Sequence, residues 1–170
     1  MKAWVVAALA VMSAGTAAAQ DEKREKIGEW EVTTIVDPIT DQGRAMAFLP
    51  GDGGRLGIKC DEPAPDGIYI HFLSSDYLGG DFDRRSVTIR FDQDAPTQQI
   101  WSFKDSSAVQ TSDREAMAFA RRVVSAERVV VRGSSYRGEE RTGIFATGGS
   151  GAREAISRVF EVCQAGRIDP

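Results

Sequence analysis

Two cysteines in a chain that opens with an export signal constrain the fold more than any other feature. The chain contains Cys60 and Cys163 and no further cysteine. Exported proteins meet an oxidising compartment, where two cysteines usually pair, and only one intramolecular pairing is available. Such a bond would close a loop of about a hundred residues and add roughly 4–5 kcal/mol of stability in the chain-entropy model. Because no C-x-x-C spacing is present, we expect a structural disulfide and not a redox pair.

The first 19 residues have the pattern of a secretory signal peptide. Lys2 precedes an apolar run from Ala3 to Met12, and small residues follow up to Ala17-Ala18-Ala19. The run is shorter than the roughly 20 apolar residues of a membrane-spanning helix, although a retained amphiphilic anchor is the alternative. We expect cleavage between Ala19 and Gln20 and a periplasmic location.

Length and charge indicate one domain and disfavour several classes of partner. The chain has 170 residues and a net charge of −4, which becomes −5 when Lys2 leaves with the signal peptide. An acidic balance argues against nucleic acid and against anionic membrane surfaces as partners. No later segment is apolar enough to span a membrane. We expect a charged leader over residues 20–28, a single domain over residues 29–165 and a tail over residues 166–170.

Apolar residues alternate with polar ones along much of the domain, which is typical of strands with one buried face. Turn signals recur about every 8–12 residues, a spacing that favours an antiparallel sandwich or open barrel of about eight strands. In one of these strands Cys60 shares its buried face with Leu56 and Ile58. The expected strands are Trp30–Val36, Met46–Phe48, Arg55–Cys60, Ile68–Leu73, Val87–Asp92, Ile100–Phe103, Val129–Val131 and Gly143–Ala146.

Two segments change to helical periodicity. The run Ser112-Asp113-Arg114-Glu115 has the sequence of a capping box, and apolar residues follow it at i, i+3, i+4 and i+7. The same spacing places Cys163 on the apolar face of a last helix, together with Ile156 and Val159. We therefore predict two helices, at about 112–125 and 151–163, packed on the sheet. The fold class is mainly β, or α+β, with a disulfide from helix to sheet.

The sequence offers no catalytic or metal-binding set. Its one histidine, His71, lies within an expected strand, and no second histidine is present to build an ordinary metal site. A Ser-His-Asp unit would have to use His71, and no G-x-S-x-G elbow is present. The Gly-rich segments 51–54 and 148–151 lack the Lys-Ser/Thr of a phosphate-binding loop and read as turns. We predict no catalytic residue, no bound metal and no cofactor.

A long acidic loop is the one candidate binding surface. Residues 74–83 carry Asp76, Tyr77, Asp81 and Asp83. Paired carboxylates serve glycoside hydrolysis when they face each other across a cleft, a separation that sequence does not give. A Ca²⁺ site at Asp81 and Asp83 would need further ligands.

The order of several sparse motifs resembles a known family. Trp30 opens the first strand, a D-x-x-x-D turn follows at Asp37, and an L-x-I-x-C strand ends at Cys60. An R-x-D strand ends at Asp92, and an F-x-x-G turn leads to the helix that ends in Cys163. This order, from Trp30 to Cys163, resembles the small periplasmic proteins associated with type VI secretion. The long loop over residues 74–83 departs from that pattern. The family brings no catalytic residues, so the resemblance implies an accessory role in an envelope machine.

Together these observations favour a non-enzymatic accessory or interaction protein of the bacterial envelope, whose partners are other envelope proteins. One alternative is a hydrolase or binding protein that acts on cell-wall or carbohydrate material through Asp76, Tyr77, Asp81 and Asp83. Another is an inhibitor or immunity protein that blocks a toxin.

Overall fold

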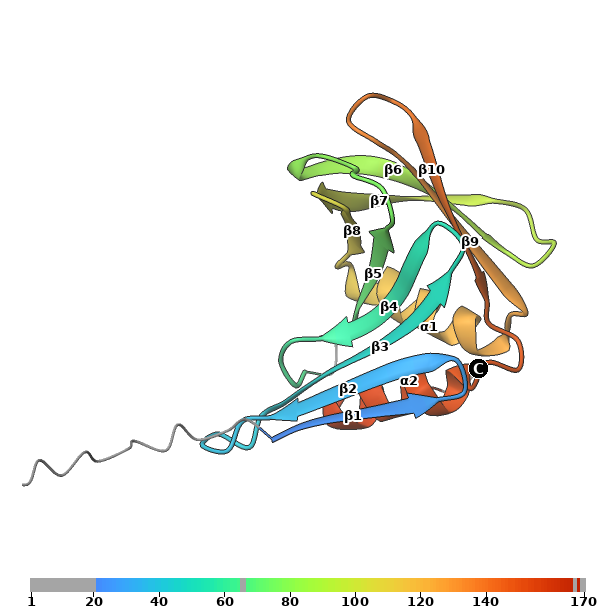
Figure 1. Ribbon diagram of the computed structural model, residues 1–170. Helices are drawn as coiled ribbons and strands as arrows, with labels where there is room; N and C mark the ends of the chain where they lie inside the picture. Colours follow the sequence, from blue (N-terminus) through green and yellow to red (C-terminus); the bar gives the residue numbers. More distant parts are fainter. Residues whose placement is uncertain (1–20, 65–66, 167, 169–170) are drawn as a thin grey trace, which may run out of the picture.

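The computed structural model describes residues 21–64, 67–166 and 168 (Figure 1). The expected signal peptide over residues 1–19 lies outside the described residues, as do positions 167, 169 and 170 of the expected tail. No helix in the described ranges is long and apolar enough to cross a bilayer.

Strands dominate the described chain, and two helices accompany them. This is the expected mainly β, α+β class. In chain order the elements are β1 (Asp21–Ile27), β2 (Trp30–Val36), β3 (Gly43–Gly51), β4 (Gly54–Cys60), β5 (Tyr69–Ser74), β6 (Asp81–Phe91), β7 (Thr97–Lys104), β8 (Ser107–Gln110), α1 (Asp113–Ser125), β9 (Arg128–Ser134), β10 (Glu140–Ala146) and α2 (Ala152–Val162).

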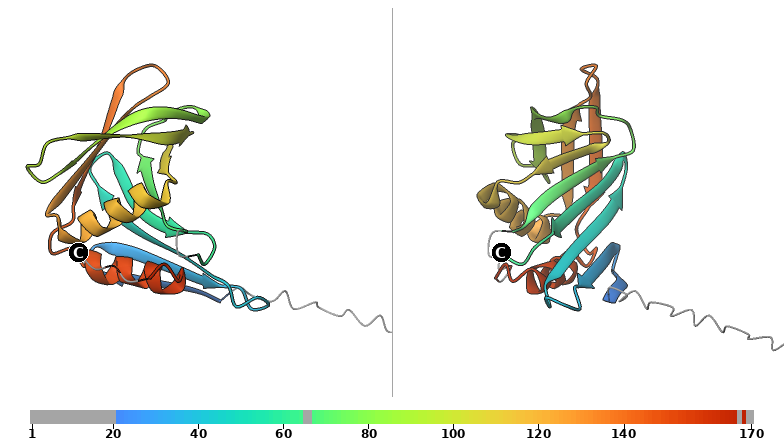
Figure 2. Two further views of the ribbon diagram at one scale, coloured as in Figure 1. Left: turned by 180° about the vertical axis from the view of Figure 1, so that it is seen from behind. Right: turned by 90° about the vertical axis from the view of Figure 1, so that its left-hand side faces the viewer.

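These strands form one antiparallel sheet of order β1-β2-β3-β4-β5-β8-β7-β6-β9-β10. The sheet curves so strongly that β10 returns to the turn between β3 and β4 (Figure 1). There the Ile144 N–H donates to the Asp52 carbonyl at 2.8 Å, and the Asp52 N–H donates to the Ile144 carbonyl at 3.0 Å. Figure 2 shows α1 and α2 stacked together at one end of the curve, with α2 along β2 and β3.

A glycine makes this close return of β10 possible. Gly53 has a φ of +80°, and a Cβ at this position would lie 2.1 Å from the Thr142 carbonyl oxygen. Both the left-handed backbone and the missing side chain are therefore needed at the tip of the β3–β4 turn.

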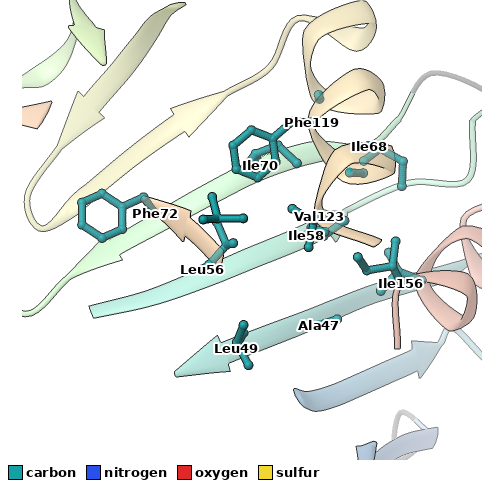
Figure 3. Close-up of a cluster of buried hydrophobic side chains, with 14 of the residues drawn as sticks. Ala47, Leu49, Leu56, Ile58, Ile68, Ile70, Phe72, Phe119, Val123 and Ile156 are labelled. Carbon is teal, nitrogen blue, oxygen red and sulfur yellow. The ribbon is translucent and has the colours of Figure 1, made fainter. Parts of the chain in front are cut away.

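The core lies between the curved sheet and the two helices. Trp30 and Trp101 are fully buried, and each such aromatic side chain contributes on the order of 2–3 kcal/mol through removal from water. The Trp30 indole N–H donates to the Ser150 hydroxyl at 3.0 Å, so its polar atom is satisfied. In Figure 3 apolar side chains from three neighbouring strands meet those of both helices: Ala47, Leu49, Leu56, Ile58, Ile70 and Phe72 face Phe119, Val123 and Ile156.

Helix α1 begins where the sequence predicts, but its first turn is held differently. Ser112 is the N-cap residue and makes no side-chain capping bond. The Gln110 side chain takes the place expected for Glu115, because its Oε1 accepts from the Ser112 N–H at 2.9 Å. Its Nε2 donates to the Glu115 carboxylate at 2.5 Å. The expected capping box is therefore wrong in its bonding, since β8 ends directly beneath the helix and delivers a competing amide.

The described chain has two strands more than expected. Strand β1 lies within residues 20–28, which we expected to be a charged leader outside the domain, and it pairs with β2 along its whole length. Its charged residues hide the alternation that marks a half-buried strand. Strand β8 has four residues and follows β7 through a turn at Asp105, where φ is +53°. Four residues are too few for a periodic signal.

The disulfide is present and joins helix to sheet as predicted. Cys60 is the last residue of β4, Cys163 caps α2, and their Cα atoms are 6.1 Å apart. Both residues are almost fully buried. The Ala64 N–H donates to the Cys163 carbonyl at 3.0 Å, which secures the same end of the helix.

Replacing both cysteines, as Cys60→Ala with Cys163→Ala, should lower the free energy of unfolding by about 2–4 kcal/mol, because the unfolded chain gains the freedom of a long loop. Urea unfolding followed by circular dichroism checks this change. Wild-type protein unfolded under reducing conditions is the matched control and should lose a similar amount. Equal stability of variant and oxidised wild type would contradict the prediction.

Candidate functional site

Two exposed tyrosines from separate loops meet at one side of the molecule. Tyr77 lies in the loop between β5 and β6, and Tyr136 lies in the turn between β9 and β10. Their ring centroids are 5.8 Å apart at an interplanar angle of 72°, an edge-to-face arrangement. Each residue is 57% exposed. We call these two residues the tyrosine platform.

Backbone hydrogen bonds connect the two loops beneath the tyrosine platform. The Tyr136 N–H donates to the Leu78 carbonyl at 2.7 Å. The N–H groups of Leu78 and Gly79 both donate to the Asp105 carbonyl, at 2.7 and 2.8 Å. The Leu78 side chain is fully buried. These hydrogen bonds hold the two loops together beneath the rings, and so they fix the position of one ring relative to the other.

One arginine joins the same two loops from below. The Arg85 guanidinium donates to the Ser134 carbonyl at 2.6 Å, to the Gly79 carbonyl at 2.9 Å and to the Leu78 carbonyl at 3.3 Å. The central carbon of the guanidinium, Cζ, lies 4.0 Å from the centroid of the Phe103 ring. The Arg85 side chain is only 17% exposed. The planar fork of donors suits this role, because it satisfies carbonyls from both loops at once.

Charged side chains surround the tyrosine platform. Arg141 pairs with Asp76 at 3.3 Å and with Glu139 at 2.5 Å. The Arg137 guanidinium lies 5.1 Å from the centroid of the Tyr136 ring. An apolar centre with a rim of both charge signs is the usual anatomy of a protein interface.

The four residues predicted from the acidic loop do not form one site in the structure. Tyr77 forms the tyrosine platform and Asp76 lies at its rim. Asp83 lies beneath the tyrosine platform, where its carboxylate is 2.7 Å from Arg85 Nε. Asp81 is exposed at the start of β6 and makes no ion pair or side-chain hydrogen bond with another described residue. Asp76 and Asp83 thus pair with different arginines, Arg141 and Arg85.

Sequence reasoning missed Tyr136, Arg85 and Arg141. Tyr136 and Arg141 lie far along the chain from the acidic loop and reach it only because β9 and β10 pair beyond β6. The segment Ser135-Tyr136-Arg137-Gly138, an aromatic residue within a turn signal, was the one available hint. Among the described residues, no group of His, Cys, Asp and Glu side chains could hold a metal ion.

His71 lies in β5 on the face opposite the buried Ile70 and Phe72, and takes part in a separate cluster. Its Nε2 is 2.9 Å from the Ser107 hydroxyl, and its ring packs edge-to-face against Phe48 with centroids 5.8 Å apart. Phe48 also covers Gly57, where a Cβ would lie 2.5 Å from the Phe48 ring. Burial lowers the pKa of His71 to about 4; the positive charge of Lys59 acts in the same direction and Asp61 opposes it.

The motif residues that carry the family resemblance have structural roles. The Asp37 carboxylate accepts the N–H groups of Ile39 and Thr40, which closes the β2–β3 turn. The Asp92 carboxylate accepts the N–H groups of Glu127 and Arg128 at the start of β9. These residues therefore specify turns and strand entry, and they say little about activity.

The chain also has a cleft of about 560 Å³ between the end of α1 and the start of α2. Small residues such as Ala126, Gly148 and Ala152 line much of it. Its lining contains neither tyrosine of the platform nor any of the predicted site residues.

Comparison with known proteins adds no relative: no protein-family model matches the chain, and no similar curated protein or solved structure was found.

Replacing Arg85 with lysine keeps the charge but removes the fork of donors, so the two loops should separate more readily. We expect the Arg85→Lys variant to lose about 1–3 kcal/mol of local opening free energy at the amides of Leu78, Gly79 and Tyr136. Hydrogen exchange measured by mass spectrometry checks this loss. Arg84→Lys, at the exposed neighbouring position, is the matched control and should leave exchange at these amides unchanged. Equal exchange in the two variants would contradict the role of Arg85.

His71 should make the protein less stable in acid. Because its folded pKa of about 4 lies below the ordinary value near 6.5, the unfolded chain binds the proton more tightly between these values. Stability is therefore full above about pH 6.5 and falls as the pH drops towards 4, by at most about 3 kcal/mol. Urea unfolding of His71→Gln across this window should show a shallower loss than wild type. Parallel curves for the two proteins would refute the assignment.

Proposed function

We propose that the protein is a non-catalytic interaction module of the bacterial envelope, which binds a protein partner through the tyrosine platform. The observation that carries this proposal is the pair of exposed tyrosines held in fixed positions by Arg85 and by the bond between Tyr136 and Leu78. Tyrosine contributes a large amphipathic contact area at a low cost in conformational entropy, and such residues are common at binding hot spots.

The charged rim gives the proposed contact its specificity. Asp76, Glu139 and Arg141 form a small network at the edge of the tyrosine platform, with donors and acceptors that a partner can match. Rim charges of this kind contribute more to orientation and partner choice than to affinity. The apolar area of the rings supplies the affinity.

The envelope setting of this proposal rests on the expected signal peptide and on the disulfide, which is compatible with an exported protein. The resemblance to type VI secretion-associated proteins leads us to propose other envelope proteins, including components of a secretion machine, as partners. In this role the protein would be an accessory subunit with no chemistry of its own.

A photo-crosslinking amino acid at position 77 or 136 tests the proposal in cells that export the protein. We expect both positions to give the same discrete protein adduct, identified by mass spectrometry. The same amino acid at position 39 is the control, because Ile39 is 86% exposed and lies in the β2–β3 turn. It should give no such adduct. Adding Tyr136→Ala to the position-77 variant should reduce the adduct at least tenfold, since it removes half of the tyrosine platform.

Other outcomes would redirect the assignment. Identical adducts from positions 39 and 77, or none from either platform position, would overturn a specific protein interface. Retention of the protein on purified cell-wall polysaccharide, lost in Tyr77→Ala, would favour the carbohydrate-binding alternative. An adduct with an enzyme whose activity the protein blocks would favour the inhibitor alternative.

A further inference from the structure

Strand β1 forms one edge of the sheet. It is the terminal strand of the sheet order and pairs only with β2 among the described residues. Figure 1 shows β1 along the lower border of the curved sheet. The outward N–H and C=O groups of a terminal strand can pair with a strand of another molecule. The edge runs over Asp21–Ile27, which is seven residues.

The charges along β1 are complementary to themselves when the strand is reversed. The sequence reads Glu22-Lys23-Arg24-Glu25-Lys26. If two copies align antiparallel with Arg24 opposite Arg24, each Glu22 faces Lys26 and each Lys23 faces Glu25. Side chains directly opposite in an antiparallel pair lie about 5 Å apart on one face of the sheet, so all of these pairs are attractive.

Neighbouring symmetric alignments are much less favourable. Every symmetric alignment places one like-charged pair on the axis, so the flanking pairs decide between them. Shifting the axis to residue 23 loses the pairings of Glu22 with Lys26 and of Lys23 with Glu25. Shifting it to residue 25 loses them too and places each Arg24 opposite Lys26. At the central position each Arg24 is already bound to Glu22 of its own chain at 2.5 Å, which reduces the repulsion between the two guanidinium groups. The edge carries charges of both signs, so a reversed copy of the same strand can match them.

We infer that β1 is a homodimer interface, in which two copies of this chain join their sheets antiparallel about a two-fold axis at Arg24. This inference does not depend on the tyrosine platform, which belongs to other strands and loops. Seven residues of edge pairing bury less than the roughly 1,200 Å² of a standard stable interface, so the dimer should be weak, with a Kd in the micromolar range or above. Its ionic pairs should also make it weaker at high salt.

Analytical ultracentrifugation of the full chain as isolated from the cell, at concentrations up to about 1 mM and at low salt, tests the interface. Glu22 and Lys26 are both exposed on the outer face of β1, so changes there spare the ion pair between Glu25 and Arg158. In the proposed dimer, position 22 of each chain faces position 26 of the other, so this contact occurs twice. Glu22→Lys alone therefore places lysine opposite lysine at both contacts, and Lys26→Glu alone places glutamate opposite glutamate. Each should weaken dimerisation about ten- to a hundredfold.

A mixture of the two single variants tests the proposed charge pairing most directly. An equimolar mixture of the two single variants should form a heterodimer, because position 22 of each chain then carries the charge opposite to that at position 26 of the other chain. The double variant, with both changes in one chain, restores opposite charges at positions 22 and 26 and should dimerise more strongly than either single variant. Glu154→Lys, an equal charge change at an exposed position on α2, is the control and should not affect dimerisation.

The inference fails if wild type stays monomeric over the whole concentration range, or if the mixture remains monomeric while wild type dimerises. It also fails if Glu154→Lys weakens the dimer as much as Glu22→Lys. Circular dichroism of each variant separates these outcomes from unfolding.

Discussion

The disulfide between Cys60 and Cys163 holds α2, the helix that closes the core, against the sheet. It secures the end of α2 to β4, while the start of the same helix is secured by Ser150, which binds both the Trp30 indole and the Glu29 N–H. A helix of eleven residues is too short to be stable alone, so these two anchors and its apolar face keep it on the sheet. The burial of Trp30 depends on this arrangement.

Much of the architecture follows from local patterns in the sequence. Alternating residues predicted most of the strands, helical spacing predicted α1 and α2, and both cysteines fell on buried faces, as found. The failures also have physical causes. β1 pairs fully with β2 although every one of its residues except Ile27 is charged, and β8 is too short to show a useful period. The bonding of the α1 cap was set by Gln110, a tertiary competitor that local rules do not include.

The candidate site was far less predictable, because it is assembled by the sheet order and not by neighbouring residues. Tyr77 and Asp76 stood out in an acidic loop, but their partners Tyr136 and Arg141 come from a distant part of the chain. Arg85 lies next to Arg84 in the sequence, and nothing in the local pattern distinguishes the two. Only the curvature that brings the β9–β10 turn over the β5–β6 loop gives it carbonyls from both sides.

The separation of the two cysteines along the chain has a consequence for biosynthesis. Cys60 is made 103 positions before Cys163, so its partner is absent until every element from β5 to α2 has been synthesised. A product that terminates between α1 and α2 keeps Cys60 unpaired and also lacks the helix that packs on β2 and β3. Such an incomplete chain combines a free thiol with exposed apolar surface. The disulfide thus distinguishes the protein from any product that ends between Cys60 and Cys163.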